Sequence, residues 1–181
     1  MRGLRHNPLT AALAVALILT PVVAPAKQWV IAPAQSYVVF EYERGGELRH
    51  GRFTGFAGEG TLDPEALGEA RLELRLATDS IDLGSGLANA LANALATSTE
   101  WFDSANHPLA VYRLRALTPL EDGSYWATGE ITIRGRTRPI TAGLVLEIGD
   151  EAAHAVGSLR LDRTEFQVGF GLTALLVGIS R

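Results

Sequence analysis

The stretch Arg71-Leu72-Glu73-Leu74-Arg75-Leu76 decides the fold class, because three leucines alternate with three charged residues. Successive side chains of a β-strand point to opposite faces of its sheet, so a period of two separates the leucines from the charges. We therefore predict a half-buried strand, with one face toward an apolar interior and the other toward water.

Similar alternation on both sides of this stretch predicts an antiparallel sheet of many short strands. Val38 and Phe40 share one face of a predicted strand over residues 36–42, and Tyr112 and Leu114 share one face of another. Turn-forming Gly, Asp and Pro residues separate the runs, so we expect tight turns between them. The remaining predicted strands are residues 52–62, 125–134, 139–148 and 155–162.

One segment departs from this pattern. Residues 86–96 are rich in alanine and carry Leu87, Leu91 and Leu95 at helical spacing. This spacing predicts a short helix with one apolar stripe, and Ser85 is a suitable N-cap residue. We thus predict a single all-β domain with one short helical insertion.

The start of the chain has the order of a secretory signal. A short basic region precedes an apolar run, and a small-residue tripeptide ends at Ala26. Pro21 interrupts the apolar run, whereas a membrane span needs about 20 apolar residues without a break. We predict that residues 1–26 are a cleaved signal peptide and that residues 27–181 form a mature domain in the periplasm.

Composition excludes several functional classes. The 181 residues include no cysteine, so disulfides, thiolate metal sites and cysteine nucleophiles are excluded. The net charge is −4, and the concentrated basic face of a nucleic-acid-binding protein is missing. His50, His107 and His154 lack the i, i+4 partner of a helical zinc site, although their convergence in space stays open.

Weaker patterns leave catalytic and anion-binding alternatives. Asp79, Asp82 and Asp162 would support an acid–base enzyme only if they faced one cavity. Residues 134–138 contain three arginines that would suit an anion, with a solvated hairpin turn as the simpler explanation. Gly84-Ser85-Gly86 lacks the surroundings of a nucleophile elbow or a phosphate loop. We predict no catalytic residue, no metal site and no resident cofactor.

The predicted inward faces mix large and small side chains. Small side chains leave volume inside a closed barrel of about eight strands, which can be filled or can hold one small ligand. Whether the volume is a pocket stays open at this point. The small inward residues are Ala110, Ala127, Gly129, Ala142 and Gly157.

Several blocks of sequence follow one another in a specific order from Trp29 to the end of the chain. They are Trp29-Val30-Ile31, Ser36-Tyr37-Val38-Val39-Phe40, Gly51-Arg52-Phe53-Thr54-Gly55-Phe56-Ala57-Gly58, Asp79-Ser80-Ile81-Asp82-Leu83-Gly84, Trp101-Phe102-Asp103 with His107-Pro108, residues 129–139 and residues 161–169. Together they resemble the YceI-like family of periplasmic polyisoprenoid-binding proteins. Gln35 departs from the family, which usually has histidine at this position.

The resemblance implies a lipocalin-like antiparallel β-barrel of eight strands that encloses a polyisoprenoid, such as a quinone tail. The chain stops at Arg181, where the family runs on into a final strand, so closure of the barrel and a homodimer that fills the gap both stay open. We expect a lipid-binding protein that sequesters or carries its ligand and is not an enzyme. Its expected lipid contacts, each with ordinary core packing as the alternative, are Val38, Phe40, Leu72, Leu74, Leu76, Tyr112, Leu114, Ile131 and Ile133.

A second hypothesis needs no bound lipid. In it, the domain is an interaction module that docks on a membrane electron-transfer protein, or touches the inner membrane transiently, through Trp101, Phe102 and residues 134–138. Aromatic residues and arginine are enriched at such interfaces.

Overall fold

Ten strands and one α-helix form the described part of the chain, which a computed structural model gives for residues 27–44, 46–84 and 86–169. The helix is α1 (Leu87–Thr97), and 3₁₀ turns are η1 (Pro33–Gln35), η2 (Leu67–Glu69), η3 (Thr78–Ser80) and η4 (Arg163–Phe166). The strands are β1 (Lys27–Val30), β2 (Val38–Arg44), β3 (Glu47–Phe53), β4 (Phe56–Leu62), β5 (Arg71–Ala77), β6 (Ile81–Asp82), β7 (Leu109–Pro119), β8 (Tyr125–Ile133), β9 (Arg136–Ile148) and β10 (Ala153–Ser158).

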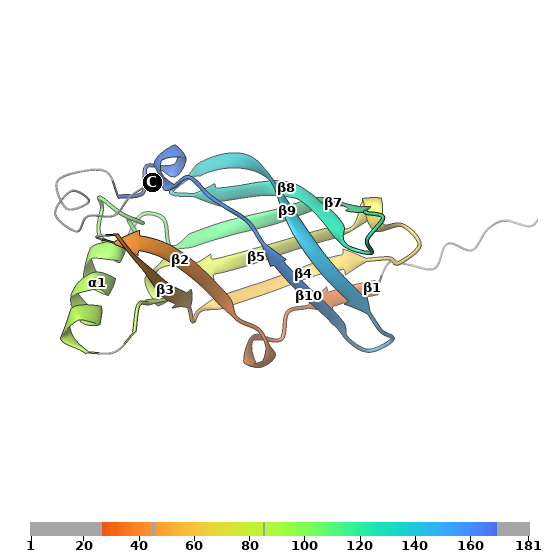
Figure 1. Cartoon of the computed structure of the whole chain (residues 1–181), viewed down its shortest axis with the longest axis horizontal. Helices are drawn as coiled ribbons and strands as arrows, with labels where there is room; N and C mark the ends of the chain where they lie inside the picture. Colours follow the sequence, from red (N-terminus) through yellow and green to blue (C-terminus); the bar gives the residue numbers. More distant parts are fainter. Residues whose placement is uncertain (1–26, 45, 85, 170–181) are drawn as a thin grey trace, which may run out of the picture.

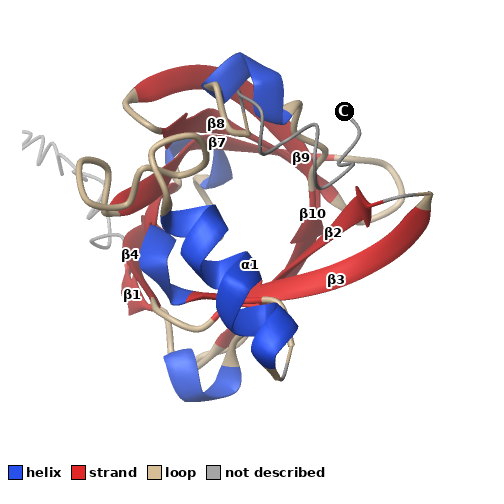
Figure 2. Ribbon diagram, turned by 90° about the vertical axis from the view of Figure 1, so that its left-hand side faces the viewer, coloured by secondary structure: helices blue, strands red, loops and turns tan. Residues whose placement is uncertain are grey.

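The strands form two antiparallel sheets. The larger sheet has the order β1-β4-β5-β7-β8-β9-β10, and the smaller sheet has the order β2-β3-β6. The larger sheet is strongly curled, and β2 and β3 lie across from it (Figure 1). Seen from one end, the two sheets surround a common interior and α1 lies across the near end (Figure 2). The predicted antiparallel β architecture with one short helix is therefore confirmed.

The strand count differs from the eight strands that the resemblance implies. The described residues form two separate sheets, and no strand ladder joins β10 to β2 within residues 27–44, 46–84 and 86–169. Closure of the barrel by a final strand after Arg181 is not tested, because residues 170–181 lie outside the described residues.

The predicted strand over residues 52–62 is wrong in one respect, because the chain leaves one sheet and enters the other within it. β3 ends at Phe53 and β4 begins at Phe56. The Thr54 backbone N–H donates to the Ser80 carbonyl at 3.1 Å, and the Gly55 carbonyl accepts from the Ala77 N–H at 2.8 Å. The break thus ties both sheets to the turn after β5.

The predicted helix is confirmed, but its apolar stripe is not buried as a whole. Leu87 and Leu91 are 82% and 61% exposed, whereas Ala96 is buried. Gly86, with φ of 95°, immediately precedes the helix, and the predicted cap Ser85 lies outside the described residues. Across the described chain, no helix combines the length and the apolar character that a membrane span requires.

Strand register brings the apolar residues to one face of the larger sheet, which we call the inner face. Leu72 lies opposite Gly60 on β4 and opposite Leu114 on β7, and Leu114 lies opposite Gly129 on β8. Since directly opposed residues share a face, all these residues point inward. The small residues predicted to point inward share this face, as the registers of Ala110, Ala127, Gly129, Ala142 and Gly157 show.

The core consists of two buried clusters along the inner face. One cluster, near the helix-bearing end, contains Trp101, Ile131, Ile133 and Phe166. The other contains Leu114 and Leu117, and Tyr112 and Leu72 pack against it. The first cluster also includes Ala110 and Val168, and the second also includes Ala70 and Ala127. The inner face is therefore packed in two places and not along its whole length.

Candidate functional site

All predicted lipid contacts except Val38 and Phe40 lie on the inner face of the larger sheet. Leu74 lies opposite Gly58 on β4 and Tyr112 on β7, and Tyr112 lies opposite Ile131 on β8. The alternation in sequence puts these residues on one face of each strand. Directly opposed residues on paired strands point to the same side of the sheet, so the faces join into one.

Val38 and Phe40 lie in the smaller sheet instead, on β2. Phe40 packs against Phe53, with ring centroids 5.4 Å apart, and Phe53 packs edge-on against Phe102 at 6.0 Å. These separations are typical of aromatic pairs in a core. Phe40 therefore belongs to an aromatic cluster on the smaller sheet, apart from the contacts on the larger one.

Burial separates the predicted contacts on the inner face into two groups. Leu114, Ile131 and Ile133 are 6–8% exposed and belong to the packed clusters. In contrast, Leu74 is half-buried and is a member of neither cluster. The half-buried group consists of Leu72, Leu74, Leu76 and Tyr112. Leu76 packs against one cluster, and Leu72 and Tyr112 pack against the other, so only Leu74 of this group lies outside both.

We use the name inner strip for Trp29, Gly58, Leu72, Leu74 and Tyr112, which occupy two adjacent rows of the inner face. Trp29 enters the strip because it lies opposite Gly60, the residue that also faces Leu72. The sequence analysis named Trp29 only as part of the family resemblance and did not identify it as a contact. Its strand has four residues, too few for alternation to assign a face.

Two polar atoms of the inner strip are buried without a hydrogen-bonding partner among the described residues. They are the indole Nε1 of Trp29 and the hydroxyl of Tyr112. Burial raises the pKa of the Tyr112 hydroxyl above its usual value, so it remains a neutral donor. The strip is thus apolar along its leucines and carries two hydrogen-bond donors.

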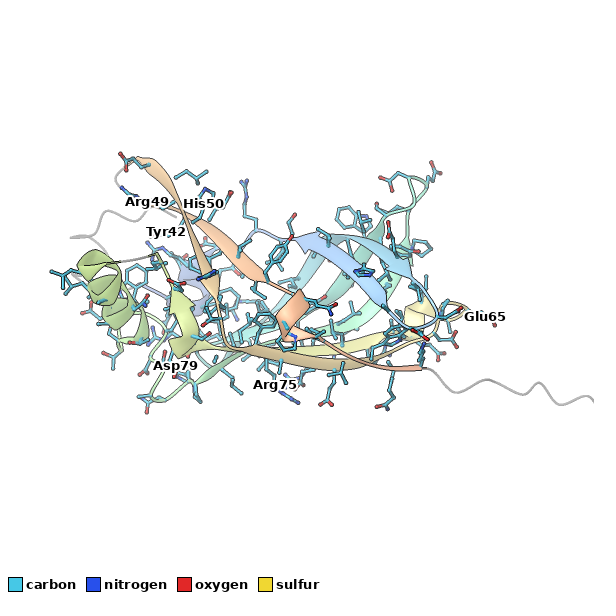
Figure 3. The ribbon with its side chains drawn as sticks, turned by 90° about the horizontal axis from the view of Figure 1, so that it is seen from below. Tyr42, Arg49, His50, Glu65, Arg75 and Asp79 are labelled. Atoms are coloured by element: carbon cyan, nitrogen blue, oxygen red, sulfur yellow. The ribbon has the colours of Figure 1, made fainter. Side chains whose placement is uncertain are left out.

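The opposite face of the larger sheet carries ion pairs. The Glu73 carboxylate accepts from Arg113 Nε and from Arg75 Nε, each at 2.6 Å. The hydrogen bond from Arg113 is the main cause that lowers the pKa of Glu73, and burial partly opposes it. Arg75 points away from the sheet on its outer side (Figure 3). The charges of the 71–76 stretch therefore face water, as predicted.

Two of the three carboxylates of the enzyme alternative, Asp82 and Asp162, have structural partners. Asp82 accepts from Arg52 at 2.7–2.8 Å and from the Gly84 backbone N–H at 3.0 Å. The Asp162 carboxylate accepts from the Thr164 backbone N–H at 2.8 Å and so begins η4. The bonds from the Gly84 and Thr164 N–H groups hold turns, and the Arg52 pair joins β3 to β6.

The histidines lie on separate elements. His50 is on β3 beside Glu41, with Nδ1 3.4 Å from Oε1, and His107 precedes β7, with Nε2 4.0 Å from the Asp103 carboxylate. His154 lies exposed on β10. In the described ranges, no group of three or more His, Asp or Glu side chains is placed to hold a metal ion.

The docking hypothesis loses its proposed surface. Trp101 is 8% exposed and sits in a core cluster, with Phe102 packed against it. Arg134 donates to the carbonyls of Thr99 and Gln167, and Arg138 donates to the carbonyls of Thr137 and Glu165. The aromatic residues and two of the arginines are therefore used inside the fold. The arginines of this hairpin turn connect it to the segments around Thr99 and Gln167.

Two clefts lie away from the inner strip as a whole. One, of about 320 Å³, is lined by residues of β9 and by residues 159–166. The other, of about 340 Å³, is lined mainly by outward-facing residues of β4, β5 and β7 such as Arg71, Glu73 and Arg113. Charged and apolar residues line both clefts, and Leu72 is the residue of the inner strip that reaches the second one.

Comparison with known proteins gives one family. The YceI-like domain matches residues 29–180. A UPF0312 protein of Shewanella denitrificans is 24% identical over 165 residues, covering 90% of this chain and 80% of the relative. A UPF0312 protein of Vibrio parahaemolyticus is 23% identical over 174 residues, covering 91% and 89%.

Solved structures show the same fold. BcnA of Burkholderia cenocepacia superposes with a TM-score of 0.72 at 24% identity, covering 80% of this chain and 90% of that one. A polyisoprenoid-binding domain from Saccharophagus degradans superposes with a TM-score of 0.63 at 15% identity, covering 86% and 90%. With a curled antiparallel sheet, an apolar inner face and a family match over most of its length, this chain belongs to the YceI-like domain family.

Proposed function

We propose that the protein is an exported lipid-binding protein that holds a polyisoprenoid chain, such as the tail of an isoprenoid quinone, along its inner strip. The observation that carries the proposal is the incomplete burial of Leu72, Leu74 and Leu76 on the inner face, where Leu74 packs against neither core cluster. A structural neighbour is described as a polyisoprenoid-binding domain, which supports this ligand class. Leu72 and Leu74 of the inner strip would contact the chain, together with Leu76 in the next row of the inner face.

The energetics suit a carrier that also releases its load. Burial of one methylene group contributes about 0.8 kcal/mol, so a fully desolvated five-carbon unit contributes about 3–4 kcal/mol. A bilayer offers the same chain a similar gain, because its interior is equally apolar. The net preference for the protein is then small, and transfer to and from a membrane is expected to be reversible.

We propose that residues 1–26 direct export and that the mature protein starts at Lys27 in the periplasm. The basic start, the apolar run and the small residues before Lys27 support this location. A periplasmic carrier would meet isoprenoid lipids at the inner membrane. We therefore expect transient membrane contact as part of the same function.

Leu74→Glu tests the proposed function. A carboxylate in the middle of the inner strip removes apolar contact and adds a charge that a hydrocarbon chain cannot compensate. We expect the purified variant to lose co-purifying isoprenoid lipid at least tenfold. The measurement is organic extraction of the purified protein followed by mass spectrometry.

Val145→Glu is the matched control for this test. Val145 is 56% exposed on β9 and points away from the inner face, so the same new charge meets water. We expect this variant to keep its lipid. Circular dichroism checks that both variants are folded, and a folded Leu74→Glu protein that retains wild-type lipid would contradict the proposal.

A further inference from the structure

The inner strip contains two hydrogen-bond donors, which a purely apolar binding surface does not require. The Tyr112 hydroxyl and the Trp29 indole N–H are both buried, and neither has a hydrogen-bonding partner among the described residues. A buried polar group without a partner costs about 1–3 kcal/mol, so such groups are uncommon in native proteins. A pure hydrocarbon ligand would leave both donors unsatisfied.

Register places both donors on the side where the lipid is proposed to lie. Tyr112 shares its row with Leu74, and Trp29 shares the neighbouring row with Leu72. Gly58 lies opposite Leu74, and Gly60 lies between Trp29 and Leu72. Glycine offers no side chain that could accept a hydrogen bond, so these neighbours cannot satisfy the donors.

The Tyr112 ring is held in place by the sheet. Its Cε2 atom lies 3.1 Å from the position that a Cβ on Gly129 would occupy, so the ring rests over that glycine. Tyr112 also packs against the cluster of Leu114 and Leu117. A ring supported in this way presents its hydroxyl in a fixed position, which lowers the entropic cost of binding an acceptor.

Charged groups near the strip do not favour an anionic acceptor at Tyr112. Arg138, which shares a row with Ile131 and Tyr112, already donates to the carbonyls of Thr137 and Glu165. Lys27 lies over the Trp29 ring, with Nζ 4.6 Å from the centroid, at the start of β1. A neutral oxygen avoids the cost of burying an unpaired charge beside the hydroxyl.

Resting on the proposed function, we infer that the inner strip selects isoprenoids that carry a neutral hydrogen-bond-accepting oxygen, a carbonyl, an ether or a hydroxyl, over isoprenoid hydrocarbons. The Tyr112 hydroxyl donates to this oxygen while the chain lies along Leu72, Leu74 and Leu76. Trp29 supplies a second donor in the adjacent row. Tyr112 is then a specificity-determining residue for the ligand class.

A competition between two probes tests this inference. Purified protein is incubated with phosphatidylcholine vesicles that contain equal amounts of geranylgeranylacetone, an isoprenoid ketone, and neophytadiene, an isoprenoid hydrocarbon. The protein is then separated by gel filtration, and both probes are quantified by mass spectrometry. We expect wild-type protein to retain the ketone over the hydrocarbon by about fivefold to tenfold, as expected for one additional buried hydrogen bond.

Tyr112→Phe removes only the donor oxygen. We expect it to abolish most of the preference for the ketone while hydrocarbon retention stays unchanged, and we expect Trp29→Phe to reduce the preference in the same direction. Tyr37→Phe is the control, since Tyr37 is 76% exposed. Without ligand, Tyr112→Phe should unfold at a temperature equal to or above that of the wild type, because it removes an unpartnered buried group; a lower temperature would indicate a structural partner and overturn the inference.

The outcomes separate this inference from the function on which it rests. If wild-type protein retains neither probe, the proposed lipid binding is wrong. If it retains both and Tyr112→Phe leaves their ratio unchanged, lipid binding stands and the selection by Tyr112 is wrong.

Discussion

Gly129 and Gly60 show at the residue scale how the larger sheet curls. Each lies on the inner face, opposite Leu114 and Leu72 respectively. A Cβ on Gly129 would overlap the main-chain oxygen of Arg113, and a Cβ on Gly60 would overlap that of Arg71. The absence of a side chain therefore lets neighbouring strands approach closely on the concave side.

Gly129→Ala is expected to destabilise the protein by about 1–3 kcal/mol, because the methyl group forces the backbones of β7 and β8 apart. Gly143→Ala is the matched control, since the nearest atom to its Cβ would be Trp126 Cζ3 at 3.8 Å, an ordinary contact. Urea denaturation measures the free energy of unfolding of both variants. Equal stability of the two would contradict the proposed close approach.

The orientation of side chains was predictable in strands with strict alternation. It was not predictable in short strands or in segments that pass from one sheet to the other. The inward orientation of Leu72 and Tyr112 followed from a period of two over six residues. The assignment of Phe40 to a second sheet did not follow from this period. Alternation shows which residues share a face of a strand, but it does not show which strands pair. The buried donor of Trp29 was also not predictable, since hydrogen-bond satisfaction depends on neighbours that are distant in sequence.

At the scale of elements, the outer face of the larger sheet joins β4, β5 and β7 through side-chain charge. Glu73 on β5 bonds Arg113 on β7, and Arg75 lies 3.6 Å from the carboxylate of Glu59 on β4. Cross-strand pairs of opposite charge support sheet register. β5, whose sequence decided the fold class, therefore directs its leucines to the inner face and its ion-paired residues to the outer face.

Glu73→Gln is expected to lower the free energy of unfolding by about 0.5–1 kcal/mol at neutral pH, the range for partly exposed ion pairs. The pKa of Glu73 is lowered from 4.5 in the folded protein, mainly by Arg113. Its contribution is therefore complete above pH 4.5 and is lost as the pH falls through the lower folded value.

Urea denaturation at several pH values checks this prediction. The difference between wild type and Glu73→Gln should shrink below pH 4.5 and vanish once Glu73 is protonated. Glu121→Gln, on the exposed turn between β7 and β8, should match the wild type throughout. A difference that persists at low pH would show that the carboxylate charge is not its source.

The helix illustrates the limit of periodicity at this scale. Leucine spacing predicted α1 correctly, because the 3.6-residue period is a local property. The same spacing did not determine whether the stripe faces the core, and Leu87 and Leu91 are exposed. Helix formation is thus readable from the sequence, whereas helix packing depends on the sheet across whose end it lies.

For the whole molecule, the predicted signal peptide and the domain meet near residue 27. The family match starts at residue 29, close to the predicted cleavage position after Ala26. β1 starts at Lys27, so cleavage after Ala26 would leave every described strand intact. The cleavage position stays a prediction, because residues 1–26 lie outside the described residues.

Expression of residues 1–181 in a Gram-negative host is expected to give a periplasmic product that begins at Lys27. Cell fractionation followed by intact-mass measurement checks this expectation. Ala26→Lys should block cleavage, because signal cleavage requires a small residue at this position, and should leave a longer precursor. A wild-type product that begins at Met1 in the cytoplasm would contradict the proposed export.

Several arginines join distant segments through main-chain oxygens, and this has a consequence for how the family diverges. Arg134 donates to the carbonyls of Thr99 and Gln167, and Arg71 donates to that of Arg115. Every residue type offers the same carbonyl, so mutation at the accepting positions leaves these joints intact. Covariation between residue pairs would not detect these hydrogen bonds. A relative at 24% identity can therefore share the architecture without sharing the residues that accept them.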